Sequence, residues 1–272
     1  MMFSDQVWLL AGILALAGCF SGFLAGLLGV GGGIVVVPAL FHVLGAFDVP
    51  LDLRMHIAIG TSLGSIIPTS IISLRAHNKR KAVDWPLLKE WAPWVAVGVV
   101  IGSVLASMAR GATLTAIFAV MALIIACYLA FARSDYHISK SLPRTPLRQI
   151  ICMAIGGFSA MMGIGGGSFT VPTLTLCSYP IRRAVGTASA IGLIIAVPGA
   201  VSFVVTGWGM AGLPTASLGY VNLLAVAALV PSSLIFAPLG AKVAHTVSGG
   251  ILRKFFALFL LATSLRMFYS LA

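Results

Sequence analysis

Long apolar stretches recur along the whole chain, and short segments that hold most of the charged residues separate them. A helix of about 20 apolar residues crosses the hydrocarbon core of a bilayer, which is roughly 30 Å thick. The pattern therefore predicts an all-α, polytopic membrane protein. The predicted segments are residues 7–28, 33–47, 56–75, 91–109, 112–132, 149–163, 167–179, 184–206, 218–239 and 251–271.

Two of these segments are too short to cross a bilayer as regular helices. Ser168–Tyr179 spans about 18 Å and Ile34–Phe47 about 21 Å at helical rise. Each is predicted to be interrupted, either as one arm of a re-entrant hairpin or as a crossing that is partly unwound. The sequence leaves both arrangements open.

Both short segments begin at the same phrase. Residues 29–38 and 163–172 each read G-x-G-G-G-x-x-x-x-P, and they lie 134 positions apart. An Ala-x-Gly-Thr phrase at 58–61 returns at 184–187. A third set recurs 138 positions on, with Ala106, Leu114, Phe118 and Ala119 matched by Ala244, Leu252, Phe256 and Ala257. Self-similarity at such a spacing indicates that the chain is built from two structural repeats.

Five predicted segments fall in each half, and an odd number inserts the second half upside down relative to the first. The sequence thus predicts inverted-topology repeats at residues 1–132 and 149–272, joined by a cytoplasmic linker at 133–148. Repeats of this kind place a binding site near the membrane midplane, at the interface between the halves.

The charge distribution agrees with this topology. The chain has 17 Lys and Arg against six Asp and Glu, and only 8% of its residues are charged. If both termini face out, the predicted inner side holds Arg75, Lys79, Arg80, Lys81, Lys89, Arg133, Lys140, Arg144, Arg148, Arg182, Arg183, Lys242, Arg253 and Lys254. Cytoplasmic loops carry such an excess, so we predict an inner-membrane protein with both termini non-cytoplasmic. Basic residues spread over short loops do not indicate nucleic-acid binding.

The glycine phrases are the strongest candidates for a site. Successive glycines permit close approach of a ligand or another backbone, and a helix that starts at them, or at Pro38 and Pro172, directs free N–H groups inward. Such an N-terminus attracts an anion. Tight helix packing is the structural alternative. The predicted anion-binding residues are the glycines and the hydroxyl residues of the next segments: Gly31, Gly32, Gly33, Thr61, Ser62, Gly165, Gly166, Gly167, Thr187 and Ser189.

A second group of residues is predicted to gate the pathway or couple it to an ion. Histidines titrate near neutral pH, and arginines at a segment end attract anions. The group contains Pro38, His56, His77, Pro172, Arg182 and Arg183. The four cysteines lie apart in apolar segments, so neither a metal site nor a cofactor is predicted.

Enzyme motifs give one weak alternative. No Gly-Lys dipeptide exists, which removes a P-loop for ATP. Residues 60–64 match the G-x-S-x-G nucleophile elbow, which keeps an intramembrane serine protease as the enzyme alternative. The segment is apolar and offers no mid-span histidine as base.

At these residues the chain resembles the sulfite exporter TauE/SafE family over nearly its full length. The supporting stretches are 26–40, 56–63, His77 with 83–85, 163–174, 182–190, 218–221, 237–245 and 252–261. The resemblance implies a secondary transporter that exports, or in some members takes up, sulfite or small organosulfonates, driven by an ion gradient. The expected partners are such an anion, a coupling ion, most simply the proton, and the lipid bilayer. Alternating access through repeat rocking is expected; a passive anion channel is the main alternative.

Overall fold

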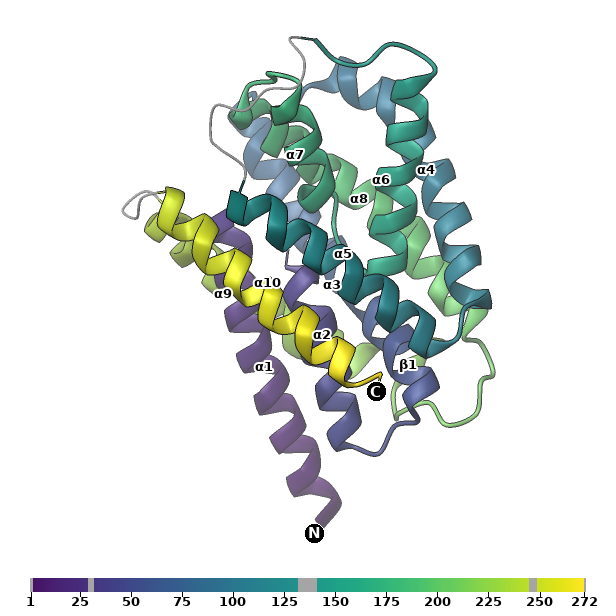
Figure 1. The fold of residues 1–272 in the computed structure, drawn as a ribbon. Coiled ribbons are helices and arrows are strands. Elements are labelled where there is room, and N and C mark those ends of the chain that lie inside the picture. The colour runs from purple at the N-terminus through teal and green to yellow at the C-terminus, as the bar shows by residue number, and fades with distance from the viewer. Residues whose placement is uncertain (1, 29–31, 132–140, 245–248, 272) are drawn as a thin grey trace.

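The computed structural model describes residues 2–28, 32–131, 141–244 and 249–271, and Figure 1 shows their arrangement. These residues form α1 (Met2–Leu28), α2 (Gly33–Ala46), α3 (Leu51–Lys79), α4 (Trp85–Met108), α5 (Gly111–Phe131), α6 (Leu147–Met162), α7 (Gly167–Leu176), α8 (Ile181–Thr206), α9 (Leu223–Ala244) and α10 (Gly249–Tyr269), with a two-stranded hairpin of β1 (Ser217–Leu218) and β2 (Val221–Asn222). The all-α prediction is confirmed.

Each predicted apolar segment corresponds to one helix, but several helix starts differ. Helices α3 and α4 begin five or more residues earlier than predicted, because their first turns are polar and lie outside the apolar stretch. The start of segment 218–239 was wrong, since residues 218–222 belong to the hairpin. Gly219 turns the chain there with a positive φ of 56°, and the Asn222 carboxamide oxygen accepts the Ala225 N–H at 2.9 Å to begin α9.

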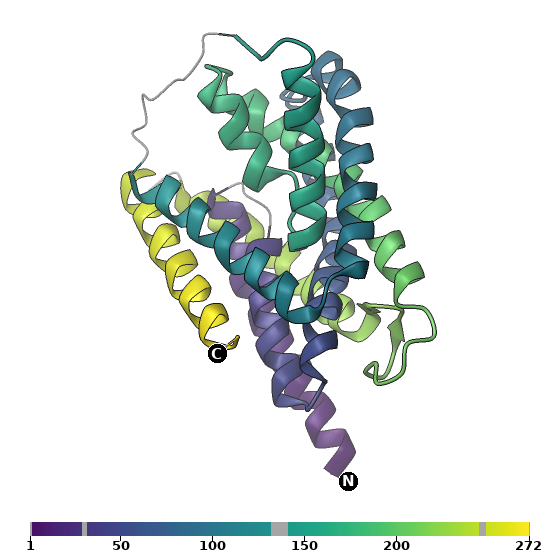
Figure 2. The same ribbon diagram turned by 45° about the vertical axis from the view of Figure 1, so that its right-hand side comes forward.

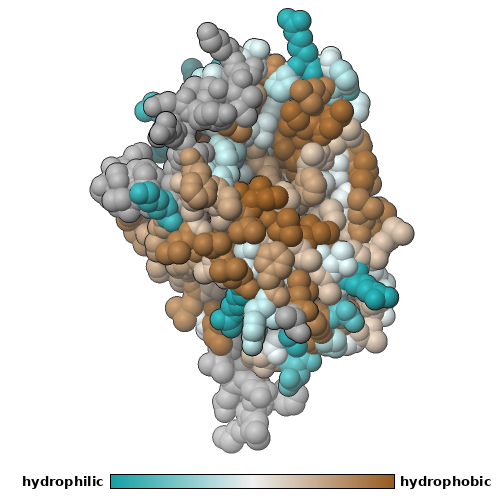
Figure 3. Space-filling model, viewed as in Figure 1, coloured by the Kyte–Doolittle hydropathy of each residue, from teal (hydrophilic) through white to brown (hydrophobic). Residues whose placement is uncertain are grey.

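The outer surface is apolar enough for a bilayer. Among the residues that the structure describes, five helices are long and apolar enough to cross a membrane: α3, α4, α5, α8 and residues 223–240 of α9. Large side chains such as Val104, Ile124 and Leu258 are at least half exposed. Figure 3 shows apolar side chains across the middle of one face, with hydrophilic ones towards its upper and lower ends. An apolar band between polar ends is typical of a protein that spans a membrane.

Helices α6 and α7 enter the molecule and return to the same end. At the start of α6, Arg148 forms an ion pair with Glu90 of α4. Just after α7, the Tyr179 hydroxyl donates to Asp84, which caps the start of α4. Both ends of the α6–α7 hairpin therefore lie beside the first turns of α4. We call this end of the molecule the Asp84 end.

Helices α1 and α2 form the corresponding hairpin from the opposite end. Figures 1 and 2 show α2 running back towards the end at which α1 begins. The β1–β2 hairpin also lies at that end, which we call the Tyr220 end after the residue in its turn. Among the described residues, each glycine phrase thus lies between a helix that enters the molecule and a short helix that runs back towards the same end.

The pairs of helices that pack together are related between the two halves of the chain. The main partners are α1 with α9, α4 with α6, α3 with α8, and α5 with α10. Suppose that α1–α5 correspond in order to α6–α10, so that α1 corresponds to α6 and α4 to α9. The α1–α9 pair then corresponds to the α6–α4 pair, and we call these two the exchanged pairs. The α3–α8 and α5–α10 pairs each correspond to themselves. Backbones approach closely in the exchanged pairs: a methyl group at Gly22 would lie 2.3 Å from the Ser233 carbonyl oxygen, and one at Gly102 would lie 2.4 Å from that of Gly157.

Candidate functional site

Both short helices begin at the glycines rather than at the prolines. Helix α2 starts at Gly33 after Gly32 as N-cap, and α7 starts at Gly167 after Gly166. Pro38 and Pro172 lie inside these helices. Because the first N–H groups of a helix have no acceptor within it, α2 and α7 each direct free donors from their first turn. Gly31 lies outside the described residues.

The two glycine turns meet inside the protein. Gly163 ends α6 in the left-handed conformation, with φ at 65°. A methyl group at Gly33 would lie only 2.4 Å from the Gly163 carbonyl oxygen, so no larger residue fits there. The same methyl group would lie 3.1 Å from the end of the Ile66 side chain, which also approaches Gly165 within 3.8 Å. The start of α2 and the turn before α7 therefore share neighbours.

Gly165 and Gly166 differ in how tightly they are packed. A methyl group at Gly166 would lie 2.7 Å from the Gly192 backbone nitrogen and 2.9 Å from the Ala188 carbonyl oxygen, both on α8. At Gly165 the nearest atom would be 3.5 Å away, an ordinary contact. Packing explains the glycine at 166 but leaves the one at 165 without a steric reason.

The predicted hydroxyl donors all have protein partners. Ser62 donates to the Gly163 carbonyl oxygen at 2.7 Å, and Ser189 to that of Gly186 at 2.6 Å. Thr61 accepts the Asn222 N–H at 2.9 Å, and Thr187 accepts the N–H of Asp84 at 3.0 Å. These bonds occupy the Ser62 and Ser189 protons, whereas both threonine hydroxyls keep theirs. Of the four, the threonines are the better placed to donate to an anion.

Other buried hydroxyl groups have no partner. In the described part of the chain, the buried hydroxyl oxygens without a hydrogen bond belong to Ser103, Ser159 and Thr170. Ser159 lies in the last turn of α6 and Thr170 in the first turns of α7, on either side of the second glycine turn. Buried polar groups are normally satisfied, so these two hydroxyls are additional candidates for contact with a polar ligand.

Gly60-Thr61 and Gly186-Thr187 make equivalent contacts at opposite ends of the molecule. A methyl group at Gly60 would lie 2.7 Å from the Tyr220 carbonyl oxygen, and one at Gly186 would lie 2.4 Å from that of Ala82. Each following threonine accepts the N–H of the residue that caps α9 or α4. Ala82 and Tyr220 are 138 positions apart, as are the two capping residues. Each half of the chain thus fixes a helix start of the other half.

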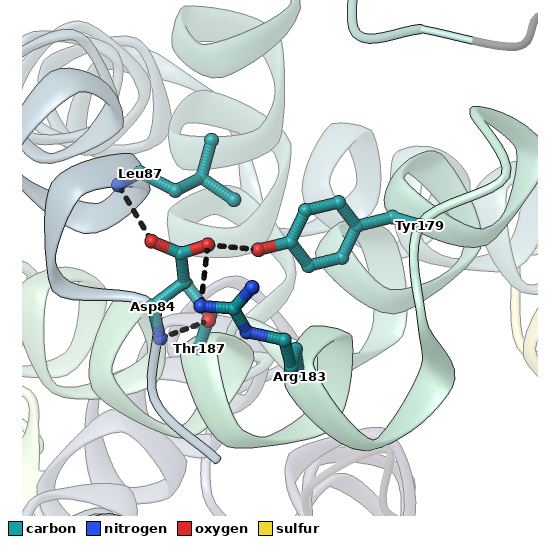
Figure 4. A network of polar contacts seen from close by, with 5 residues as sticks. All are labelled: Asp84, Leu87, Tyr179, Arg183 and Thr187. Carbon is teal, nitrogen blue, oxygen red and sulfur yellow. Dashed lines mark hydrogen bonds and ion pairs between the residues drawn. The ribbon is translucent and has the colours of Figure 1, made fainter. Parts of the chain in front are cut away.

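Asp84 is the centre of a polar cluster at its end of the molecule (Figure 4). One carboxylate oxygen accepts the Leu87 N–H at 3.1 Å. The other accepts the Tyr179 hydroxyl and lies 3.3 Å from an Arg183 nitrogen. With the bond from its N–H to Thr187, Asp84 ties the start of α4 to the α7–α8 connection.

The Asp84 cluster is built around an ionised carboxylate. Burial opposes ionisation, but the hydrogen bonds from Tyr179 and Leu87 and the charge of Arg183 outweigh it and hold the pKa of Asp84 below its usual value. Burial and the bond to Asp84 raise the pKa of Tyr179 to about 12, so its hydroxyl remains a donor at neutral pH.

The predicted gating residues are spread over both ends. Arg182 and Arg183 lie in the first turn of α8 and His77 in the last turn of α3, all at the Asp84 end. His56 is buried in the second turn of α3 at the Tyr220 end. The structure therefore does not bring these side chains together in one site.

Sequence reasoning missed Asp84, Tyr179 and Asn222 as interacting residues. The signal was present, because Val83-Asp84 and Val221-Asn222 extend the match at an offset of 138. The hydrogen bonds to the threonines join residues more than 100 positions apart. Only the fold reveals that pairing.

The two helical hairpins, interrupted at glycines and surrounded by apolar helices, are those of a polytopic membrane protein of the transporter class. The chain belongs to the sulfite exporter TauE/SafE family, whose profile matches residues 14–267.

Curated relatives carry transporter names. The chain is 37% identical over 255 residues to a probable membrane transporter protein of Haemophilus influenzae, covering 93% of this chain and 96% of the relative. It is 28% identical to a probable membrane transporter protein of Methanocaldococcus jannaschii, covering 90% of each chain. One from Bacillus subtilis is 29% identical, covering 85% of this chain and 87% of the relative. No solved structure matches the chain.

Proposed function

We propose that the protein is a secondary transporter that exports a small sulfur-containing anion, sulfite or an organosulfonate, by alternating access. The single observation that carries the proposal is the meeting of the two glycine turns at Gly33 and Gly163, within a chain of the sulfite exporter family. Two helix N-termini that approach one region supply backbone N–H groups and positive dipole ends, which favour an anion.

The proposed site contains the starts of α2 and α7 and the hydroxyls around them. The N–H groups at the predicted glycines would bind the anion. Thr61 and Thr187, which lie towards opposite ends, would each donate a proton to it on their own side of that site. Ser159 and Thr170 extend the set predicted from sequence, because their buried hydroxyls lack partners. Gly165 would face the anion, since a methyl group there would make only ordinary contacts, the nearest with the Ile66 side chain at 3.5 Å.

The proposed architecture is two inverted repeats, 1–132 and 149–272, with 133–148 as a cytoplasmic linker. The exchange of helix pairs between α1–α5 and α6–α10 supports it. The equivalent bonds from Thr61 and Thr187 support it too, since each joins one half to the other at opposite ends. Rocking of the repeats would open and close these ends in turn.

We assign the Asp84 end to the cytoplasm. Arg148 and Arg183 lie at the Asp84 end, together with other basic residues close to them in the sequence. Arg54 and Arg110 lie at the Tyr220 end, where fewer Lys and Arg residues are found. Lys and Arg accumulate in cytoplasmic loops. Both termini then face outwards, and Arg182 and Arg183 lie where an anion would enter from the cell.

Flux through purified protein in proteoliposomes tests the function. Labelled sulfite, thiosulfate and sulfoacetate are expected to exchange by saturable counterflow, with acetate as the matched anion that lacks sulfur. Flux that does not saturate and shows no counterflow would favour the channel. Competition by acetate alone would contradict the sulfur assignment.

The protease alternative has little geometric support. The Ser62 hydroxyl donates to the Gly163 carbonyl oxygen, whereas a serine nucleophile needs a histidine or another base as its partner. Replacing Ser62 by Ala is expected to weaken the contact between α3 and the second glycine turn and to reduce flux without any effect on proteolysis.

A further inference from the structure

His56 is buried between backbone groups that only accept hydrogen bonds. Its side chain is 6% exposed. Ring atom Nδ1 lies 3.0 Å from the Asp52 carbonyl oxygen, and Nε2 lies 3.1 Å from that of Ala106. A neutral imidazole has one N–H, so it can donate to only one of these oxygens, whereas a doubly protonated ring donates to both.

Two further features of the surroundings favour a positive ring. Ala106 lies in the last turn of α4, where the helix dipole presents its negative end to a cation. The Tyr220 ring centroid lies 5.0 Å from that of His56, within the range at which an aromatic ring attracts a cation. The two carbonyl oxygens beside the ring nitrogens and the neighbouring Tyr220 ring therefore favour the doubly protonated form of His56.

No carboxylate explains this arrangement in the described part of the chain. The charged groups nearest in sequence are Asp52 and Arg54 on α3 and Arg110 after α4. Arg54 donates to the Val49 carbonyl oxygen at 2.6 Å, and Asp52 and Arg110 are exposed. From the hairpin comes Tyr220, a neutral phenol at physiological pH. Backbone carbonyl oxygens are thus the groups that face the ring nitrogens.

The other described histidines at helix positions have different surroundings. His42 lies near Arg54 and Arg266, and His77 lies near Arg80. Fixed positive charges already occupy their neighbourhoods. His42, which lies outside every predicted site, serves as the matched control for His56.

We propose that His56 is the binding site of the coupling proton and that its doubly protonated ring holds the Tyr220 end closed. The proton-bound ring joins α3 to the end of α4 beneath the hairpin. Loss of the proton leaves one ring nitrogen with a lone pair that faces a carbonyl oxygen, and this loosens the contact, which lets the end open. Because the proton-bound form is closed and the proton-free form opens, the anion and the proton travel in opposite directions. The inference rests on the proposed function.

Proteoliposomes with labelled sulfoacetate test the coupling. Vesicles with a lumen more acidic than the bath are expected to accumulate the anion through the wild-type protein. His56→Gln is expected to lose at least about tenfold of this accumulation while counterflow at equal pH continues. His42→Gln is expected to keep both activities. Accumulation by His56→Gln at the wild-type level would overturn the proposal.

Two further measurements cover the case in which His56→Gln misfolds. His56→Arg keeps a permanent charge, so it is expected to slow counterflow at every pH; exchange as fast as wild type would count against the closed state. In the wild type, the ¹⁵N signals of His56 are expected to show two protonated ring nitrogens in the closed state and one in the open state. A ring that stays neutral throughout would overturn the assignment, whereas wild-type protein that exchanges no anion would instead refute the proposed function.

Discussion

At the scale of single residues, the glycines of the two phrases have distinct roles. Gly33 faces the backbone of the second turn, Gly166 faces α8, and Gly163 has a positive φ. Gly165 alone of these has ordinary space around it and a conventional backbone. The repeated phrase therefore combines positions at which packing requires glycine with one, Gly165, at which packing does not require it.

Gly33→Ala is expected to destabilise the protein by roughly 1–3 kcal/mol, because the new methyl group meets backbone atoms that cannot rotate away. Alanine is the better helix former, but the 2.4 Å approach to the Gly163 carbonyl oxygen outweighs that gain. Thermal unfolding in detergent measures the change. Gly165→Ala, the control, is expected to unfold like wild type; equal losses in both variants would show that packing does not distinguish them.

Asp84→Asn is expected to lower the free energy of unfolding at neutral pH by roughly 1–3 kcal/mol, since a charge-assisted acceptor is lost. The folded-state pKa of Asp84 lies below its ordinary value of 3.8. Its contribution is therefore present above the unfolded pKa and is lost as pH falls through the folded pKa. The difference between variant and wild type should shrink below about pH 4 in thermal unfolding.

Asp48→Asn is the matched control for this change. Asp48 is an exposed carboxylate in the connection between α2 and α3, with a positive φ of 55° that asparagine also accepts. Its stability should equal that of wild type at both pH values. A pH-independent loss in Asp84→Asn would show that the carboxylate charge is not what stabilises the cluster.

At the scale of elements, the re-entrant hairpins make a topological prediction. Cys177 follows α7 and Phe47 follows α2, each as the C-cap of its helix. With the other native cysteines replaced, Cys177 is expected to react with an impermeant thiol reagent from the cytoplasmic side. A Phe47→Cys variant that lacks Cys177 is expected to react from the outside. Labelling of both from one side would contradict the opposed hairpins.

At the scale of the whole molecule, the prediction concerns orientation. Figures 1 and 2 show α1 starting and α10 ending towards the Tyr220 end. A reporter enzyme that folds only outside the cytoplasm is expected to be active when fused after α10. The same reporter inserted at residues 141–146 is expected to be inactive, since that segment precedes α6 at the Asp84 end. The reverse pattern would invert our assignment of sides.

The two ends of the molecule share a backbone plan but differ in chemistry. Thr187 and Asp84 hold one end, with Arg183 and Tyr179 adding an ionic contact. At the other end the Thr61 hydroxyl accepts the backbone N–H of Asn222. The side-chain nitrogen of Asn222 donates to the Thr215 carbonyl oxygen and to the Ser217 hydroxyl. The cap there is uncharged, and the buried titratable side chains described above at that end are His56 and Tyr220.

The sequence by itself determined the helical class, the ten apolar segments, the helix breaks at the glycines and the membrane setting. These follow from local properties, namely apolar length, glycine runs and the position of basic residues. Only the tertiary structure decided that the short segments return, that the hydroxyls of Ser62 and Thr187 meet backbone groups, and that Asp84 joins Tyr179. Those outcomes depend on contacts between residues about 100 positions apart, and no local pattern specifies which distant backbone atom a buried side chain will meet.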